Sequence, residues 1–264
     1  MLGAIIGDIV GSRFEWDNIH SKDFELFGNG CHLTDDSIMT IAIAEAIFKW
    51  RADGSPSYER LSEYAERSMR SWGLAHPDAG YGAGFDKWLH NPGMGAYNSA
   101  GNGAAMRVSP VGFSAHSLEE CISMSRAVTE VTHNHPDGIK GAEATAVQIF
   151  LLRQKKDIDY IRAYEEEHYY PIGFDMHWLY ENYKWSSLCD MTCQPAYLCV
   201  YSSFGFEDAI RNAISIGGDS DTLGAIAGGI AEACWGIPED IREKGLSFLD
   251  QEMKTVLKFF SSLS

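Results

Sequence analysis

The sequence lacks two features that would place the protein at or beyond a membrane. Its longest apolar stretch, residues 222–237, is interrupted by Glu232 and is too short to cross a bilayer. The first ten residues have no basic segment of the kind that opens a secretory signal, and they include Asp8. These absences predict a soluble, cytoplasmic protein that does not act on membranes.

Positive charge is also scarce. The chain has 21 lysine and arginine residues against 37 aspartate and glutamate residues, which gives a formal net charge of −16. Such a surface does not neutralise many phosphates, so nonspecific binding to nucleic acid is not expected. One small anionic ligand remains compatible, because a bound metal reverses the local field. The 264 residues suffice for one domain, predicted over 1–264 and expected to be monomeric.

Paired cysteines are missing as well. The six cysteines are scattered, and the Cys189-x3-Cys193 spacing has no second half that would complete a structural zinc site. Free thiols in a reducing compartment are therefore the preferred interpretation.

Strand signals are few, and helical periodicity dominates. Residues 197–203 alternate weakly, a pattern that fits a strand or a helix equally well. No β-α-β alternation is present, so the predicted fold class is all-α, a compact multi-helix bundle in a single domain. Residues 73–103 are rich in glycine, and a loop region of this length favours a functional role. The helices are predicted over 38–48, 58–72, 117–131, 138–152, 207–216 and 223–235, with a last helix that begins at Pro238.

Glycine recurs at helical spacing in two places. Gly3, Gly7 and Gly11 are four residues apart, as are Gly224 and Gly228. Each glycine costs a helix about 1 kcal/mol relative to alanine. Glycine at these positions would let two helix backbones approach closely, which explains its presence despite the lower helix propensity. The first of these stretches lacks the G-x-G-x-x-G spacing of a dinucleotide-binding loop.

Two acidic motifs precede apolar helical segments near opposite ends of the chain. By itself, each is compatible with an ordinary helix cap, because carboxylates and hydroxyls stabilise helix N-termini. Together they offer hard oxygen donors of the kind that Mg²⁺ and Mn²⁺ prefer. The motifs are Thr34-Asp35-Asp36-Ser37 and Gly217-Gly218-Asp219-Ser220-Asp221-Thr222.

Three weaker signals lie elsewhere. The loop from Gly101 to Arg107 has backbone N–H groups that suit a phosphate, although a plain glycine turn explains it equally well. His133 follows a predicted helix end, where a histidine often only interacts with the helix dipole. Glu15, alone among aromatic residues, is by itself most simply a surface residue.

In combination and in this order, these motifs resemble the ADP-ribosylglycohydrolase family over nearly the whole chain. The last motif, followed by a helix rich in glycine and alanine, is the most specific. The resemblance rests on the stretches Gly3-Ala-Ile-Ile-Gly7-Asp8-Ile-Val-Gly11-Ser12, Glu15, Thr34-Asp35-Asp36, Tyr81-Gly82-Ala83-Gly84, Gly101-Asn102-Gly103-Ala-Ala-Met106-Arg107, Thr132-His133 and Gly217 to Thr222.

The resemblance implies an orthogonal all-α bundle with two Mg²⁺ or Mn²⁺ ions. It implies that Glu15 is the mobile-loop glutamate of the serine-linkage type, and that Gly82 and His133 contact the ligand. The chain departs from some relatives in having Ser37 and Ser220 where threonine is common, and in an insert over residues 157–185. The implied metal ligands are Thr34, Asp35, Asp36, Asp219, Asp221 and Thr222, and the implied pyrophosphate loop is Ser99, Ala100, Gly101, Asn102 and Gly103.

The implied reaction is hydrolysis of the C1″ glycosidic bond of ADP-ribose on a protein or a small-molecule conjugate. Either Glu15 or Asp36 would act as the base, and an oxygen-linked acceptor is favoured over an arginine linkage. Two alternatives stay open: a phosphatase that acts on a small metabolite at the same metal centre, and a noncatalytic relative like the lens crystallins of this fold.

Overall fold

The computed structural model describes residues 1–263, and these residues form helices and no strand. The predicted all-α fold class is therefore confirmed. The helices are α1 (Leu2–Gly11), the 3-10 helix η1 (Ser12–Phe14), α2 (Asp35–Ala52), α3 (Tyr58–Ala75), α4 (Ala83–Leu89), α5 (Gly103–Met106), α6 (Ser109–Ser114), α7 (Leu118–Thr129), α8 (Pro136–Arg153), α9 (Ile158–His168), α10 (Met176–Asn182), α11 (Cys189–Tyr201), α12 (Phe206–Ser215), α13 (Ser220–Trp235), α14 (Glu239–Ser247) and α15 (Gln251–Ser261).

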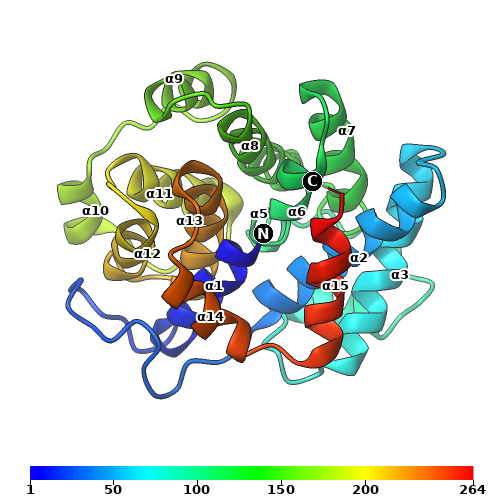
Figure 1. Ribbon diagram of the computed structural model, residues 1–264, viewed down its shortest axis with the longest axis horizontal. Helices are drawn as coiled ribbons and strands as arrows, with labels where there is room; N and C mark the ends of the chain where they lie inside the picture. The colour runs from blue at the N-terminus through cyan, green and yellow to red at the C-terminus, as the bar shows by residue number, and fades with distance from the viewer. Residues whose placement is uncertain (264) are drawn as a thin grey trace.

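Helices α1 and α13 pack against each other near the middle of the molecule (Figure 1). Helices α2, α3 and α15 lie to one side of this pair, and α11 and α12 lie to the other. Every residue of α1 is buried, which agrees with its almost entirely apolar sequence. No helix within residues 1–263 has both the length and the apolar character that a bilayer crossing requires.

The spaced glycines lie where α1 meets α13. A Cβ atom on Gly7 would be 1.8 Å from the carbonyl oxygen of Gly224, and one on Gly3 would be 2.3 Å from that of Gly228. At the end of α1, a Cβ atom on Gly11 would be 2.3 Å from the carbonyl oxygen of Ser220. The predicted close approach of the two backbones is thus confirmed, and it brings the start of α13 beside the end of α1.

Each predicted helix is present, with boundaries that differ by a few residues, and the N-caps follow the expected chemistry. The side chain of Ser117 accepts a hydrogen bond from the backbone N–H of Glu120 (3.1 Å) at the start of α7. The Glu120 carboxylate accepts from the N–H of His116 (2.6 Å), one residue before the position that a strict capping box would use.

Three expectations need correction. Residues 73–103 are not loop throughout, because they contain the end of α3 and the whole of α4. The strand alternative for residues 197–203 is wrong, because Tyr197 lies inside α11 and is fully buried between helices. The chain after Pro238 forms two helices, not one last helix. Helix α14 ends at Ser247, and Asp250 caps α15 by accepting a hydrogen bond from the N–H of Met253 (2.8 Å).

The six cysteines are free. Cys189 and Cys193 share one face of α11, and both sulfur atoms lie against Gly141 of α8. A Cβ atom on Gly141 would be 2.7 Å from the Cys189 sulfur, so this glycine allows α8 and α11 to pack closely.

Candidate functional site

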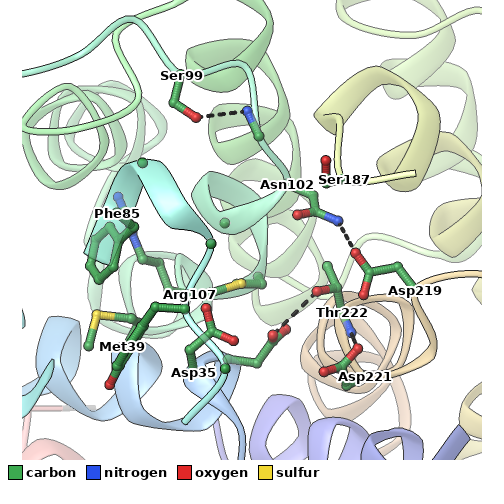
Figure 2. A pocket seen from close by; sticks show the side chains of 18 of the residues that line it. Asp35, Met39, Phe85, Ser99, Asn102, Arg107, Ser187, Asp219, Asp221 and Thr222 are labelled. Carbon is green, nitrogen blue, oxygen red and sulfur yellow. Dashed lines mark hydrogen bonds between the residues drawn. The ribbon is translucent and has the colours of Figure 1, made fainter. Parts of the chain in front are cut away.

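A cavity of about 420 Å³ opens between the starts of α2 and α13 and the glycine-rich loop before α5 (Figure 2). This volume is in the range of small-molecule sites. The predicted residues that line it are Glu15, Asp35, Asp36, Gly82, Ser99, Gly101, Asn102, Gly103, His133, Asp219, Asp221 and Thr222. Two predicted residues, Thr34 and Ala100, do not line it.

The start of α2 supplies one side of the acidic end. The Thr34 side chain caps the helix by accepting a hydrogen bond from the N–H of Asp36 (3.3 Å). The Asp35 N–H donates to the carbonyl oxygen of Ala79 (2.8 Å), which joins this turn to the segment before α4. Asp36 is buried, and its Oδ1 atom has no hydrogen-bond partner.

The start of α13 supplies the other side. Gly217 and Gly218 have φ angles of +76° and +82°, a left-handed conformation that favours glycine. The turn places Asp219 so that its Oδ2 atom accepts a hydrogen bond from the side-chain amide of Asn102 (2.7 Å). The Thr222 hydroxyl donates to Oδ2 of Asp36 (3.3 Å), so the two helix starts are in direct contact.

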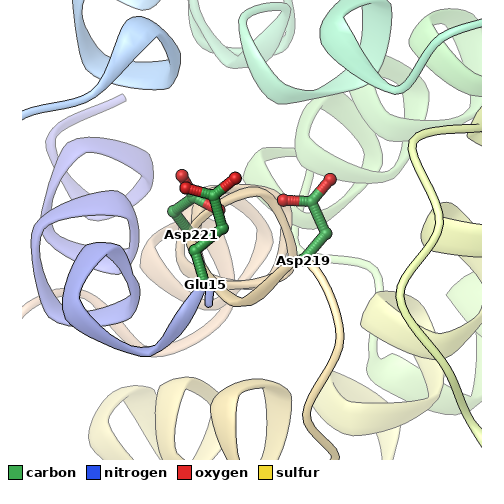
Figure 3. Close-up of side chains that lie close together, drawn as sticks. All are labelled: Glu15, Asp219 and Asp221. Carbon is green, nitrogen blue, oxygen red and sulfur yellow. The ribbon is translucent and has the colours of Figure 1, made fainter. Parts of the chain in front are cut away.

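Glu15 joins the same acidic end from the turn after η1. One carboxylate oxygen from each of Glu15, Asp219 and Asp221 lies within 4.8 Å of the other two (Figure 3). Two segments that are far apart in sequence, the turn after η1 and the start of α13, therefore direct carboxylates to one point.

Burial and mutual repulsion perturb this cluster strongly. Burial raises the pKa of Glu15 to about 7, and the charge of Asp221 adds to the rise. Burial, followed by the charge of Asp221, also raises the pKa values of Asp35, Asp36 and Asp219 well above the ordinary range. Without a positive charge beside them, these groups cannot all ionise at neutral pH.

Asp8 is a residue of this region that the sequence interpretation did not include among the site residues. It is fully buried on α1 and accepts hydrogen bonds from the N–H (3.1 Å) and hydroxyl (2.7 Å) of Thr34. It also accepts from the N–H (3.1 Å) and the hydroxyl of Ser37. A lone carboxylate within an otherwise apolar helix was the available signal, because aspartate is rarely buried without partners. Asp8 holds the first turn of α2 in place.

The opposite end of the cavity is built from the glycine-rich loop. The Asn102 N–H donates to the carbonyl oxygen of Ser187 (2.8 Å), and the Cys189 N–H donates to that of Ala100 (3.0 Å). Gly101 and Leu188 form an isolated β-bridge at the same place. Residues 186–189 thus hold the glycine-rich loop in place through these hydrogen bonds and the bridge. No local motif in the sequence indicated this contact.

His133 lies against this loop. A Cβ atom on Gly103 would be 3.2 Å from its Nε2 atom, and one on Gly101 would be 3.4 Å away. Its Nδ1 atom lies 2.8 Å from the hydroxyl of Thr132. Burial, followed by the charge of Arg107, lowers the pKa of His133 well below its ordinary value, so the imidazole is neutral at pH 7.

Arg107 is the cationic side chain among the described residues that line the cavity. It is buried, and its Nη2 atom donates to the hydroxyl of Thr132 (2.7 Å). Burial lowers its pKa to about 10, which still leaves the guanidinium charged at neutral pH. The loop end therefore offers one positive charge, and the other end offers carboxylates.

Comparison with known proteins supports a relationship along the whole chain. The family model described as ADP-ribosylglycohydrolase matches residues 1–256. An ADP-ribosylarginine hydrolase of Pseudomonas putida is 27% identical, over 90% of this chain and 70% of its own length. The ADP-ribosyl-[dinitrogen reductase] glycohydrolase of Rhodospirillum rubrum is 26% identical, over 97% of this chain and 91% of its own length.

Two further matches are more distant in sequence. The ADP-ribosylhydrolase ARH3 of Homo sapiens is 22% identical, over 90% of this chain and 85% of its own length. A solved structure titled "ADP-ribosylglycohydrolase-related protein complex" superposes with a TM-score of 0.71 at 20% identity. That superposition covers 100% of this chain and 97% of the other.

Proposed function

Because the chain belongs to the ADP-ribosylglycohydrolase family, we propose that it hydrolyses the C1″ glycosidic bond of an ADP-ribosylated protein or small-molecule conjugate and releases ADP-ribose. The observation that carries the proposal is the contrast between the two ends of one cavity. Carboxylates from three segments gather at one end, and a glycine-rich loop beside Arg107 forms the other.

The loop end fits a pyrophosphate. Gly101 and Gly103 line the cavity without a side chain, so the loop backbone is directly exposed to a ligand there, and Arg107 contributes a positive charge from the same lining. A diphosphate bound there would direct the distal ribose of ADP-ribose toward the carboxylates. The scissile bond at C1″ would then lie near Glu15 and Asp36.

The acidic end fits divalent metal ions. Asp36 has a buried oxygen without a partner, and the clustered carboxylates resist ionisation unless positive charge is present. We propose two Mg²⁺ or Mn²⁺ ions, with ligands drawn from Thr34, Asp35, Asp36, Asp219, Asp221 and Thr222. When bound, such ions would neutralise the carboxylates and polarise the ribose hydroxyls and water. Of these candidate ligands, Thr34 has the weakest support, because its hydroxyl already donates a hydrogen bond to Asp8.

Glu15 and Asp36 are the candidates for proton transfer. Glu15 is half-buried, and one of its carboxylate oxygens lies within 4.8 Å of an oxygen of Asp221, so it can reach a group that is bound at this end of the cavity. A protonated Glu15 would donate to the acceptor oxygen as the C1″–O bond breaks, and Asp36 would accept a proton from the attacking water. An alcohol leaves poorly without that proton, so this arrangement favours an oxygen-linked acceptor.

The test is a panel of defined ADP-ribosyl linkages, including serine, arginine and O-acetyl acceptors, incubated with the protein and Mg²⁺. We expect free ADP-ribose as the product, with the fastest turnover on an oxygen linkage. Release of inorganic phosphate from phosphorylated metabolites, with every linkage left intact, would replace this proposal with the phosphatase alternative. Binding of ADP-ribose without turnover of any linkage would favour the noncatalytic alternative.

A further inference from the structure

Two exposed tryptophans meet at the rim of the cavity. The rings of Trp16 and Trp185 are stacked, with centroids 5.6 Å apart and planes inclined by 27°. Trp16 is 78% exposed and Trp185 is 45% exposed, and both line the cavity. Large aromatic side chains at such exposure contribute little to a core, so the core does not explain this pair.

Trp16 immediately follows Glu15, and the segment around them is held at both ends. On one side, the ring of Phe14 packs edge-on against Phe24 at 5.2 Å. On the other side, the side chain of Asn18 donates to the carbonyl oxygen of Gly218 (2.8 Å) and accepts from its N–H (2.8 Å). Glu15 lies between these anchors.

Trp185 approaches from the chain that follows α10. This chain also contacts the start of α13: a Cβ atom on Gly218 would be 2.5 Å from the ring of Tyr183. Two residues after Trp185, the carbonyl oxygen of Ser187 accepts the hydrogen bond from Asn102. Residues 183–187 therefore touch both ends of the cavity.

From this geometry we infer that Trp185 is a positioning residue, which acts by stacking on Trp16 and so holds Glu15 over the carboxylates of α13. The inference rests on the proposed function for its consequence in catalysis, and it assigns a role to the end of the segment over residues 157–185. Trp16 directly follows Glu15 in the chain, so a displaced indole would also shift the backbone that carries the acid.

The first test measures the position of the segment without any substrate. We compare Trp185→Ala with Trp178→Ala by hydrogen exchange. Trp178 is a matched control, because it is 46% exposed, stacks on Phe174 at 5.3 Å and does not line the cavity. We expect the amides of residues 12–18 to exchange faster in Trp185→Ala only. Equal exchange in both variants and the wild type would overturn the inference, whether or not the protein proves to be a hydrolase.

The second test is a double-mutant cycle on kcat with Glu15→Gln. Loss of one aromatic pair predicts that Trp185→Ala lowers kcat by about 3- to 10-fold. Trp185→Phe keeps a ring and should restore most of the rate. If Trp185 acts through Glu15, then Glu15→Gln lowers kcat by a smaller factor in the Trp185→Ala background than in the wild type.

Two results of the cycle contradict the positioning role. An identical effect of Glu15→Gln in both backgrounds would show that Trp185 and Glu15 act independently. Weaker binding of ADP-ribose by calorimetry, with kcat unchanged, would show that Trp185 is a wall for the ligand instead. Melting curves of all variants would show whether each one is still folded at the assay temperature.

Discussion

The two ends of the cavity differ in charge and in how the chain builds them. The acidic end rests on helix starts that are fixed by backbone-to-backbone packing of α1 on α13, where glycines leave no room for a side chain. The loop end rests on hydrogen bonds between two non-helical segments, residues 99–103 and 186–189. The part that would hold metal and the reacting bond is therefore supported by close helix packing, whereas the part that would hold the diphosphate is supported by a few hydrogen bonds between distant segments.

The side-chain amide of Asn102 connects the two ends through its hydrogen bond to Asp219 (2.7 Å). Asp8 makes a similar connection at the acidic end, because it accepts hydrogen bonds that join α1 to the first turn of α2. The charge contrast between the ends can be tested by changing one end at a time.

The largest effect should come from Asp219→Asn. This change removes one carboxylate from the acidic end and keeps the shape, so we expect hydrolysis to fall by more than about 10³-fold as metal-dependent charge stabilisation is lost. The metal-free variant should melt at the same temperature as the wild type or higher, because repulsion within the cluster is reduced. Activity with and without chelator, together with melting curves, provides the measurement.

Asp240→Asn, an exposed change in the first turn of α14, is the control for Asp219→Asn. Saturating Mg²⁺ should also raise the melting temperature of the wild type by mass action. Full wild-type activity in excess chelator would contradict the metal proposal.

The next effect is expected for Glu15→Gln. The substitution keeps size and hydrogen bonding but removes the acid, so kcat should fall by about 10²- to 10⁴-fold. Metal binding, measured by calorimetry, should be largely retained. Asp17→Asn, an exposed change in the same turn, should leave the rate unchanged. Equal rates for Glu15→Gln and wild type on both serine and arginine linkages would remove Glu15 from the mechanism.

A smaller effect is expected at the loop end. In Gly101→Val, the added side chain would meet Ser99 at 3.1 Å and the Nε2 atom of His133 at 3.4 Å. We expect ADP-ribose to bind about 10-fold more weakly, which corresponds to roughly 1.4 kcal/mol, while metal binding persists. Gly95→Val is the matched control, because a Cβ atom there has no neighbour within 4 Å. Calorimetric affinities that match for both variants would show that residues 99–103 form only a turn.

The smallest effect concerns pH. Burial, with the charge of Asp221, raises the pKa values of Asp8 and Glu15 to about 7, above their unfolded values of about 4. The unfolded chain therefore ionises first, so the metal-free protein loses stability as pH rises from about 4 through about 7. We expect its melting temperature to fall by roughly 2–4 °C over this window relative to Asp221→Asn, which removes the neighbouring charge. Parallel pH profiles for the two proteins would argue against a strained acidic cluster.

Local chemistry explains which parts of the fold were predictable. Helix caps such as Ser117 and Thr34 form bonds within three residues, so their sequence motifs mark helix starts reliably. The glycine spacing on α1 and α13 predicted a close packing that the structure confirms. Short helices such as α10, and the break between α14 and α15, depend on surrounding contacts and were not predicted.

The helical fold class, the acidic motifs at two helix starts and the glycines that permit close packing could be predicted, because each depends on residues that are neighbours along the chain. The folded chain was needed to show that Glu15 lies near Asp219 and Asp221, that Asp8 accepts hydrogen bonds from Thr34, and that residues 186–189 bind the glycine-rich loop. These contacts join segments that are at least 26 residues apart. They depend on how distant helices pack, which no local pattern records.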